Sequence, residues 1–364
     1  MNVSLTGNKQ ITKLLNDWYV EIRARRIENA HHLKEAITSK ICDIQEDQNL
    51  LLFYLLLDFR YKYILDNVGV SKDSFDKIEV LGIPTDKYLT YYYHFFKGIH
   101  ASTIGDYNVA KINYEKAETL LSYIPDKLEQ AEFYYKIGAF HYDIYQGLLS
   151  IKKVTTAKEL FSQHTGYEIN IAFCNNLLGL ACTHLKEWEL AEEYFANAMN
   201  TFQKINAEKF ILMVRQNLGL LYATQNLSPL AIRYLSEVNL KMPNNHKAMF
   251  IQAREHFKLG ENTEAAEFIN KGIEISKKLN HDEYRYRFNI LKEMNKKAPA
   301  ISLEKAVLAG MDYFKRESLW EYVQEYTEVV AIKYHNEGNS EQASKYFYLS
   351  FEAKNEVFKK EALK

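Results

Sequence analysis

The sequence has few residues that interrupt helices: only five prolines and 14 glycines among 364 residues. Because proline and glycine mark turns and breaks, their scarcity favours long helices joined by short turns. Cysteine is also scarce, and Cys42, Cys174 and Cys182 contain no CxxC pair and are odd in number. This pattern does not fit a disulfide framework, so we expect buried, free thiols in a reducing cytosol.

An excess of charge and a long apolar run are absent as well. The formal net charge of −1 gives no overall attraction to nucleic acid or to an anionic membrane. The longest apolar run, Leu50 to Leu57, is far shorter than the about 20 residues that a membrane span requires. No basic segment followed by an apolar one, as in a signal peptide, opens the sequence. We therefore predict a cytoplasmic protein without direct nucleic-acid or membrane partners.

Catalytic motifs are missing too. The sequence contains no GxxxxGK[ST], GxGxxG or HExxH motif, and no serine or cysteine in a nucleophile-elbow context. The histidines do not recur at metal-ligand spacing, so we expect no metal site and no cofactor in this chain. Any chemistry would have to come from ordinary side chains inserted into the active site of another protein.

The residues that are present predict an all-α protein whose first part is a small bundle. Apolar residues recur at helical spacing over residues 8–27 and 28–45, and again from the central stretch to about residue 67. Residues 1–67 are thus predicted to form a three-helix bundle. The turn-rich residues 68–86 are predicted to be a linker. The bundle shows no helix-turn-helix pattern, which argues against direct DNA binding.

Residues 87–364 repeat with a recognisable spacing: a small residue is followed by a small one 12 positions later, a large one 16 later and a small one 19 later. Gly98, for example, leads to Ala110, Tyr114 and Ala117. The other copies start at Gly138, Gly179, Gly219, Ala253 and Ala331, and one more is expected around residues 284–316. This is the tetratricopeptide pattern of paired helices, here in about seven units. We therefore predict a right-handed solenoid whose inner face binds an extended peptide.

The central stretch, Glu46-Asp47-Gln48, precedes a leucine-rich run. On a helix, Leu51, Leu55 and Phe59 would share one face with Gln48. Two interpretations follow: a core helix whose first turn is polar, or a docking face with a polar residue at its edge.

Several segments resemble one known family. They are the Glu-Asp-Gln run with its leucine-rich helix and the following Asp58-Phe59-Arg60, residues 16–23 (NDWYVEIR), and residues 131–136 (AEFYYK). Together with seven tetratricopeptide units, they resemble the Rap family of response-regulator aspartate phosphatases, over essentially the whole chain.

The resemblance implies that the bundle docks a phosphorylated receiver domain of a response regulator, as in sporulation phosphorelays. Gln48, within the catalytic run Glu46-Asp47-Gln48, would enter the receiver's active site and orient water on the aspartyl phosphate. The receiver would supply its own Mg²⁺. Leu51, Leu55 and Phe59 would provide the apolar docking area.

The resemblance also implies that a short quorum-sensing peptide binds in the groove of the repeats and inhibits the regulator. Asn217 matches the asparagine that holds the main chain of the peptide in this family. His184 stands where relatives often carry an aspartate suited to a basic peptide residue, and Thr224 completes the predicted peptide site.

Two alternatives stay open. One is a binding-only regulator that sequesters the DNA-binding domain of a response regulator; the presence of Gln48 does not distinguish it from a phosphatase. The other is a peptide-sensing transcription factor, which the missing helix-turn-helix disfavours.

Overall fold

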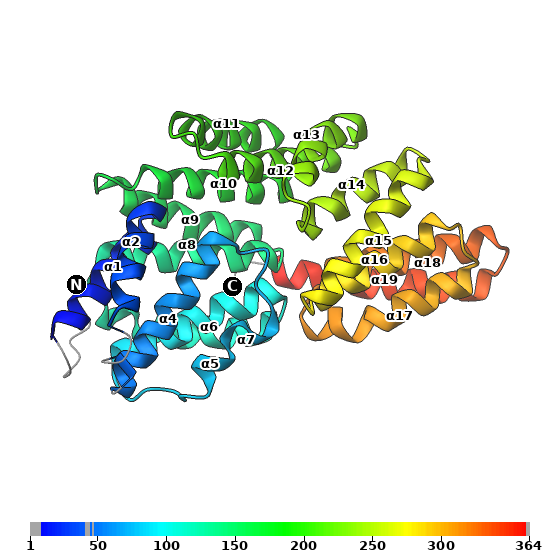
Figure 1. The fold of residues 1–364 in the computed structure, drawn as a ribbon. Coiled ribbons are helices and arrows are strands. Elements are labelled where there is room, and N and C mark those ends of the chain that lie inside the picture. The colour runs from blue at the N-terminus through cyan, green and yellow to red at the C-terminus, as the bar shows by residue number, and fades with distance from the viewer. Residues whose placement is uncertain (1–8, 41–43, 46, 362–364) are drawn as a thin grey trace. The chain divides into compact units, whose positions relative to one another are not determined.

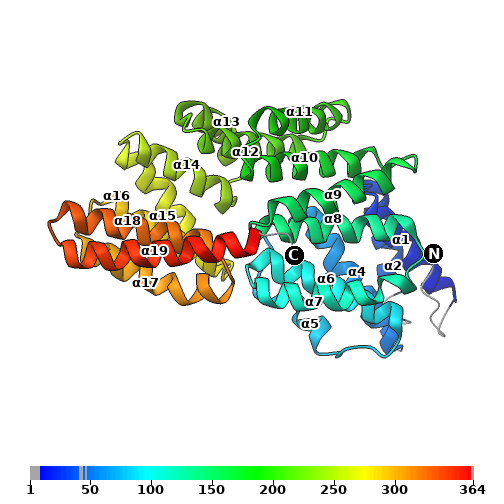
Figure 2. The same ribbon diagram turned by 180° about the vertical axis from the view of Figure 1, so that it is seen from behind.

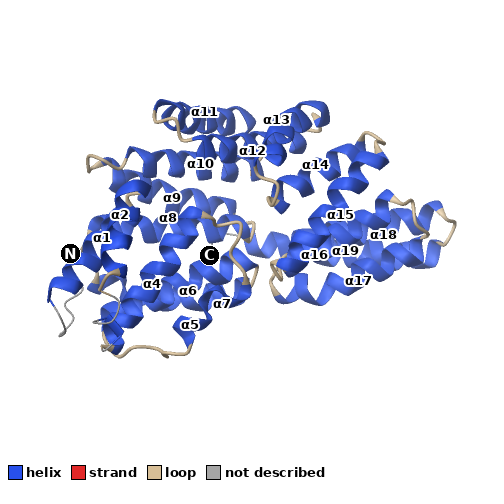
Figure 3. Ribbon diagram, in the orientation of Figure 1, coloured by secondary structure: helices blue, strands red, loops and turns tan. Residues whose placement is uncertain are grey.

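The computed structural model describes residues 9–40, 44–45 and 47–361, and these residues form helices and connecting loops without strands (Figures 1 and 3). The predicted all-α fold is confirmed. The three N-terminal helices lie close to the predicted ranges: α1 (Lys9–Arg23), α2 (Ile27–Thr38) and α4 (Gln48–Leu65). No helix in these residues is long and apolar enough to cross a membrane.

The segment predicted as a linker is folded, so this part of the prediction is wrong. It contains a 3₁₀ helix, η1 (Lys72–Phe75), and a short helix, α5 (Asp76–Glu79). Phe75 and Ile78 are only 1% and 2% exposed, and the ring of Phe75 lies 5.2 Å from that of Phe59. Burial of these apolar side chains holds the segment against α4 and α6.

Seven successive helix pairs follow in the described residues, as the repeat spacing predicts. They are α6 (Lys87–Ile104) and α7 (Tyr107–Leu120) with the short η2 (Leu121–Tyr123), α8 (Lys127–Asp143) and α9 (Gly147–Ser162), α10 (Glu168–His184) and α11 (Trp188–Lys204), α12 (Glu208–Thr224) and α13 (Ser228–Lys241), α14 (His246–Lys258) and α15 (Asn262–Lys278), α16 (Asp282–Asn295) and α17 (Ala300–Arg316), and α18 (Trp320–Asn336) and α19 (Ser340–Glu361).

Small residues are required where the two helices of a repeat cross. A methyl group added at Gly179 would lie 2.7 Å from the ring of Phe195, closer than such carbons approach in proteins. The large residues at this position of the repeat are buried, with Tyr114 2% and Phe195 0% exposed. The last repeat departs from the pattern, because its predicted groove-filling residue, Phe347, is 44% exposed.

The chain forms two compact units (Figures 1 and 2). The first contains residues 1–140 and 152–175, and the second contains residues 141–151 and 176–364. The predicted boundary after residue 67 therefore does not separate two compact units. The three N-terminal helices instead share a core with α6, α7 and most of α8.

Candidate functional site

The central stretch marks the start of α4. Gln48 is the first residue of this helix and is exposed. Asp47 is the N-cap, and its Oδ1 accepts hydrogen bonds from the backbone N–H groups of Asn49 (2.9 Å) and Leu50 (3.1 Å). The prediction of a catalytic Asp47 is therefore corrected: its carboxylate is used to satisfy the first turn of α4. Glu46 lies outside the described residues.

The three predicted docking residues divide into two groups. Leu51 and Leu55 are half-buried and lie one and two turns beyond Gln48, so they remain partly accessible beside it. Phe59 is only 5% exposed and packs edge-on against Phe75 (5.2 Å) and His100 (5.8 Å). The prediction that Phe59 contacts a partner is wrong for this structure, because the folded segment after α4 covers its ring.

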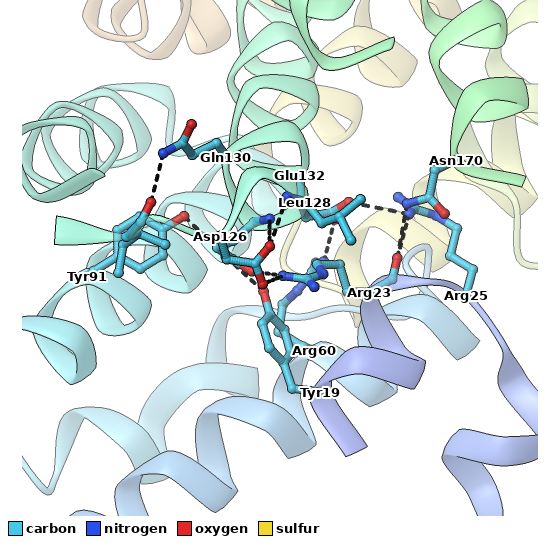
Figure 4. Close-up of polar contacts among 12 residues, drawn as sticks. Tyr19, Arg23, Arg25, Arg60, Tyr91, Asp126, Leu128, Gln130, Glu132 and Asn170 are labelled. Atoms are coloured by element: carbon cyan, nitrogen blue, oxygen red, sulfur yellow. Dashed lines mark hydrogen bonds and ion pairs between the residues drawn. The ribbon is translucent and has the colours of Figure 1, made fainter. Parts of the chain in front are cut away.

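A cluster of buried charges, which we call the ionic cluster, joins α1, α4 and α8 (Figure 4). Nη2 of Arg60 donates to Oε1 of Glu132 (2.7 Å), and the two side chains are 1% and 0% exposed. Nη1 of Arg25, in the turn after α1, donates to the other oxygen of Glu132 at 3.3 Å. Burial alone would raise the pKa of Glu132, but the two guanidinium groups lower it.

The second half of the ionic cluster centres on Glu129, one turn earlier on α8. Nη1 of Arg23 donates to Oδ2 of Asp126 (2.9 Å) and to Oε2 of Glu129 (3.1 Å). Oε1 of Glu129 accepts from the hydroxyl groups of Tyr19 (2.9 Å) and Tyr91 (3.1 Å). Burial raises the pKa of Glu129, and Arg23 offsets this only in part.

The ionic cluster brings together the three segments that carried the family resemblance. Arg23 belongs to residues 16–23, Arg60 to Asp58-Phe59-Arg60, and Glu132 to residues 131–136. Sequence reasoning treated these segments as family markers and missed their mutual pairing. A signal was present, since Arg60 and Glu132 are charged residues at apolar positions of their helices. The cluster fixes α4, and thereby Gln48, against α8.

Asn217, the predicted peptide clamp, lies on α12 and is only 5% exposed. Its Nδ2 donates to Oδ1 of Asn176 on α10 at 2.8 Å, and Asn176 is also 5% exposed. In this structure Asn217 thus belongs to a buried amide pair between the first helices of two neighbouring repeats. A carboxamide has a second N–H and a carbonyl with two lone pairs, so pairing with Asn176 uses only part of its capacity.

The other two predicted peptide contacts lie elsewhere in the repeats. His184 stacks between Tyr142 (4.3 Å between ring centroids) and Tyr145 (4.7 Å). Burial, assisted by Lys360, lowers the pKa of His184 to about 4, so the imidazole is neutral near pH 7. Thr224 is exposed, and its hydroxyl donates to the carbonyl of Leu221 at 2.7 Å. No hydrogen bond or ring contact joins Asn217, His184 and Thr224 in the described part of the chain.

The cysteines and the histidines add no further site to these. Cys174 and Cys182 are free and buried as expected, whereas Cys42 lies outside the described residues. In the ranges that the structure describes, no group of three or more His, Cys, Asp or Glu side chains could hold a metal ion.

Residues 5–66 match the family model described as "response regulator aspartate phosphatase H, N terminal". The chain is 27% identical over 359 residues to the regulatory protein RapF of Bacillus subtilis (strain 168), an alignment that covers 94% of this chain and 93% of that protein. It is 26% identical to response regulator aspartate phosphatase I of the same organism, with 97% and 93% covered. Its fold is similar to the crystal structure of a Rap protein complexed with competence and sporulation factor, with a TM-score of 0.79, 21% identity and 97% and 99% of the two chains covered.

Proposed function

The chain belongs to the Rap family, and from this premise we propose that it is a quorum-sensing regulator that dephosphorylates the phospho-aspartate of a response-regulator receiver domain. The observation that carries the proposal is the exposed Gln48 at the first position of α4, inside the segment that matches the phosphatase family model. A short signalling peptide bound by the repeats inhibits the regulator, and the solved Rap complex with competence and sporulation factor supports this part. The proposal includes a cytoplasmic location and a target of the sporulation-phosphorelay type.

The proposed reaction is hydrolysis of an acyl phosphate. Water attacks phosphorus in line, the bond between phosphorus and the aspartate oxygen breaks, and the products are the free carboxylate and inorganic phosphate. The receiver would supply Mg²⁺, whose charge would offset that of the phosphoryl oxygens. What remains is to orient the water, and the Gln48 amide offers one carbonyl acceptor and two N–H donors for this task.

Asp47 is a positioning residue in this proposal. Its two hydrogen bonds to the backbone define where α4 begins, and so they define where Gln48 leaves the helix. Leu51 and Leu55 supply accessible apolar area beside Gln48 for the receiver. Phe59 has no part in docking, because it belongs to the core.

The test is the rate at which a phosphorylated receiver domain loses its phosphoryl group in the presence of Mg²⁺. Gln48→Asn shortens the side chain by one methylene and displaces the amide by about 1 Å, which should lower the rate on the order of 100-fold. Receiver binding should be retained, since the apolar area is unchanged. Gln45→Asn is the matched control, because Gln45 is an exposed glutamine just before α4 and should react at the wild-type rate.

Three results separate the possibilities. Hydrolysis by the Gln48→Asn protein at the wild-type rate would exclude Gln48 as the water-orienting group. Failure of the wild-type protein to hydrolyse the phosphorylated receiver would refute the enzymatic proposal, and binding of the DNA-binding domain of a response regulator would then support the sequestering alternative. A gel shift of DNA by the purified protein alone would support the transcription-factor alternative.

A further inference from the structure

The first helix of the fifth repeat, α14, has an accessible side that is basic. The side chains of α14 that are not buried are Lys247, Arg254, Phe257 and Lys258. At about 100° per residue, the three cations lie within about 40° of one another around the helix, and we call them the basic stripe. Because the whole chain has a formal net charge of −1, the basic stripe is a local concentration of positive charge in a nearly neutral protein.

The arginine of the basic stripe is unusual for its position in the repeat. Arg254 follows the small residue Ala253, and the residues that follow the corresponding small residues of three other repeats are Leu180, Leu220 and Ile332. Where those repeats carry an apolar side chain, α14 presents a guanidinium group that is 24% exposed. The packing of the repeats therefore does not explain the arginine.

A buried carboxylate holds the basic stripe in place. Glu255 is 0% exposed, and it accepts hydrogen bonds from Nε of Arg254 (3.1 Å), Nζ of Lys258 (3.0 Å) and Oγ of Ser228 (2.6 Å). One carboxylate offsets the charge of only one of these two cations, so the group keeps a net positive charge. Among the described residues, the guanidinium group of Arg254 hydrogen-bonds through Nε alone. Its two terminal nitrogens are left for an end-on, bidentate contact with a second carboxylate.

The basic stripe lies beside the predicted peptide residues of α12. The two helices share a hydrophobic core that includes Ala223 of α12 and Ile251 of α14. Nζ of Lys258 also donates to the carbonyl of Ala223 at 3.4 Å, immediately before Thr224. Thr224 lies about two turns beyond Asn217 on the same side of α12.

We propose that the basic stripe binds a carboxylate of the signalling peptide, with Arg254 as the bidentate contact and Glu255 as the residue that positions it. This inference rests on the proposed function, in which the repeats bind that peptide at Asn217. Packed helices lie about 8–10 Å apart, and an extended peptide advances about 3.3 Å per residue. The carboxylate is then about two or three residues from the one that Asn217 holds, which is within the length of a short peptide. It belongs either to an acidic side chain or to the C-terminus of the peptide.

The probe for this site is a soluble library of pentapeptides with free C-termini, from which the full chain selects binders that mass spectrometry identifies. Calorimetry then compares the tightest binder with two analogues. One analogue carries amides in place of its acidic side chains, and the other has an amidated C-terminus. One of them should bind at least about tenfold more weakly, because it lacks the charge that the arginine pairs with. The analogue that loses affinity identifies the source of the carboxylate.

Variants of the chain test the assignment to Arg254. Arg254→Gln should weaken the parent peptide by a similar factor and should bind the weaker analogue as the wild-type protein does, since that analogue has already lost the contact. Arg254→Lys keeps a counter-charge for Glu255 but loses the planar fork, so its effect should be smaller. Arg215→Gln is the matched control. Arg215 also pairs with a carboxylate, Glu237 at 2.9 Å, and is 34% exposed, but it lies on the side of α12 opposite Asn217 and should not affect peptide affinity.

Circular-dichroism melts check that each variant is folded, and the two analogues test the wild-type chain even where a variant is not. The inference is overturned if neither analogue loses affinity. It is also overturned if Arg254→Gln leaves the parent peptide unaffected, or weakens the parent peptide and the weaker analogue equally. In these cases a peptide still binds, and the proposed function stands. If the chain selects no peptide from the library, the peptide part of the proposed function fails together with the inference.

Discussion

Glu132 connects the N-terminal helices to α8, and its replacement by glutamine tests the ionic cluster. The carboxylate pairs with Arg60 at 2.7 Å and with Arg25 at 3.3 Å, and it is fully buried. A glutamine at this position would keep the size of the side chain and one carbonyl acceptor, but it would leave two buried guanidinium groups without their counter-charge. Removing one partner from a buried ion pair typically costs about 3–5 kcal/mol.

The expected loss in Glu132→Gln is therefore about 3 kcal/mol or more in the free energy of unfolding of the first compact unit. In a unit of this size, about 3 kcal/mol corresponds to a decrease in melting temperature on the order of 10 °C. The pKa of Glu132 is lowered in the folded state, so its contribution is fully present above the pKa of an unfolded glutamate, about 4.3. The difference between the two proteins should thus narrow as the pH falls below this value.

Urea denaturation at pH 7, followed by circular dichroism, measures this difference. Glu118→Gln is the matched control, because Glu118 also pairs with a cation, Lys153 at 2.8 Å, but the two side chains are 42% and 24% exposed. Exposed pairs of this kind contribute about 0–1 kcal/mol. If Glu132→Gln destabilises the protein no more than Glu118→Gln, the ionic cluster does not hold the N-terminal helices as we argue.

Three further predictions follow from the positions of single side chains. Phe59→Ala removes a core ring and should lower the free energy of unfolding by about 3–5 kcal/mol, while the affinity for the receiver domain is retained. An unchanged melting temperature would show that Phe59 is not a core residue and would support a role in docking. Asn217→Ala removes one member of the amide pair and should abolish peptide inhibition while phosphatase activity persists; full inhibition of this variant would exclude Asn217 from the peptide site. Burial lowers the pKa of His184 and His281 to about 4, below the roughly 6.5 of an unfolded histidine, so the unfolded state binds more protons between these values. Stability of the second compact unit should therefore fall as the pH drops from 6.5 toward 4, by up to about 1.4 kcal/mol per pH unit for each histidine, and equal urea midpoints at pH 7 and pH 5 would contradict this.

The peptide-site corrections share one physical cause. The family resemblance implied that Asn217 holds the main chain of the peptide and that His184 stands at a position suited to a peptide side chain. In the folded chain, Asn217 pairs with Asn176 and His184 stacks between two tyrosines. Position on a helix predicts the side that a residue faces, but the neighbouring repeats decide whether that side is open.

The sequence by itself determined the helices, the repeat period and the resemblance to the Rap family. These features depend on residues that are close in the chain: Gly179 and Phe195 meet because the two helices of one hairpin cross there, and Asp47 caps the helix that it precedes. Short-range packing of this kind leaves a spacing that can be recognised without coordinates.

Only the tertiary structure decided which side of α4 is covered and where the buried charges find partners. The helix is apolar on several sides, so its sequence allowed Phe59 to be either a docking residue or a core residue, and the fold of residues 72–79 buried it. Arg60 and Glu132 are 72 positions apart, and Arg23 and Glu129 are 106 apart. Such pairs form only when α1, α4 and α8 have packed. A buried charge is stabilised by a partner within hydrogen-bonding distance, and that partner can lie at any separation along the chain.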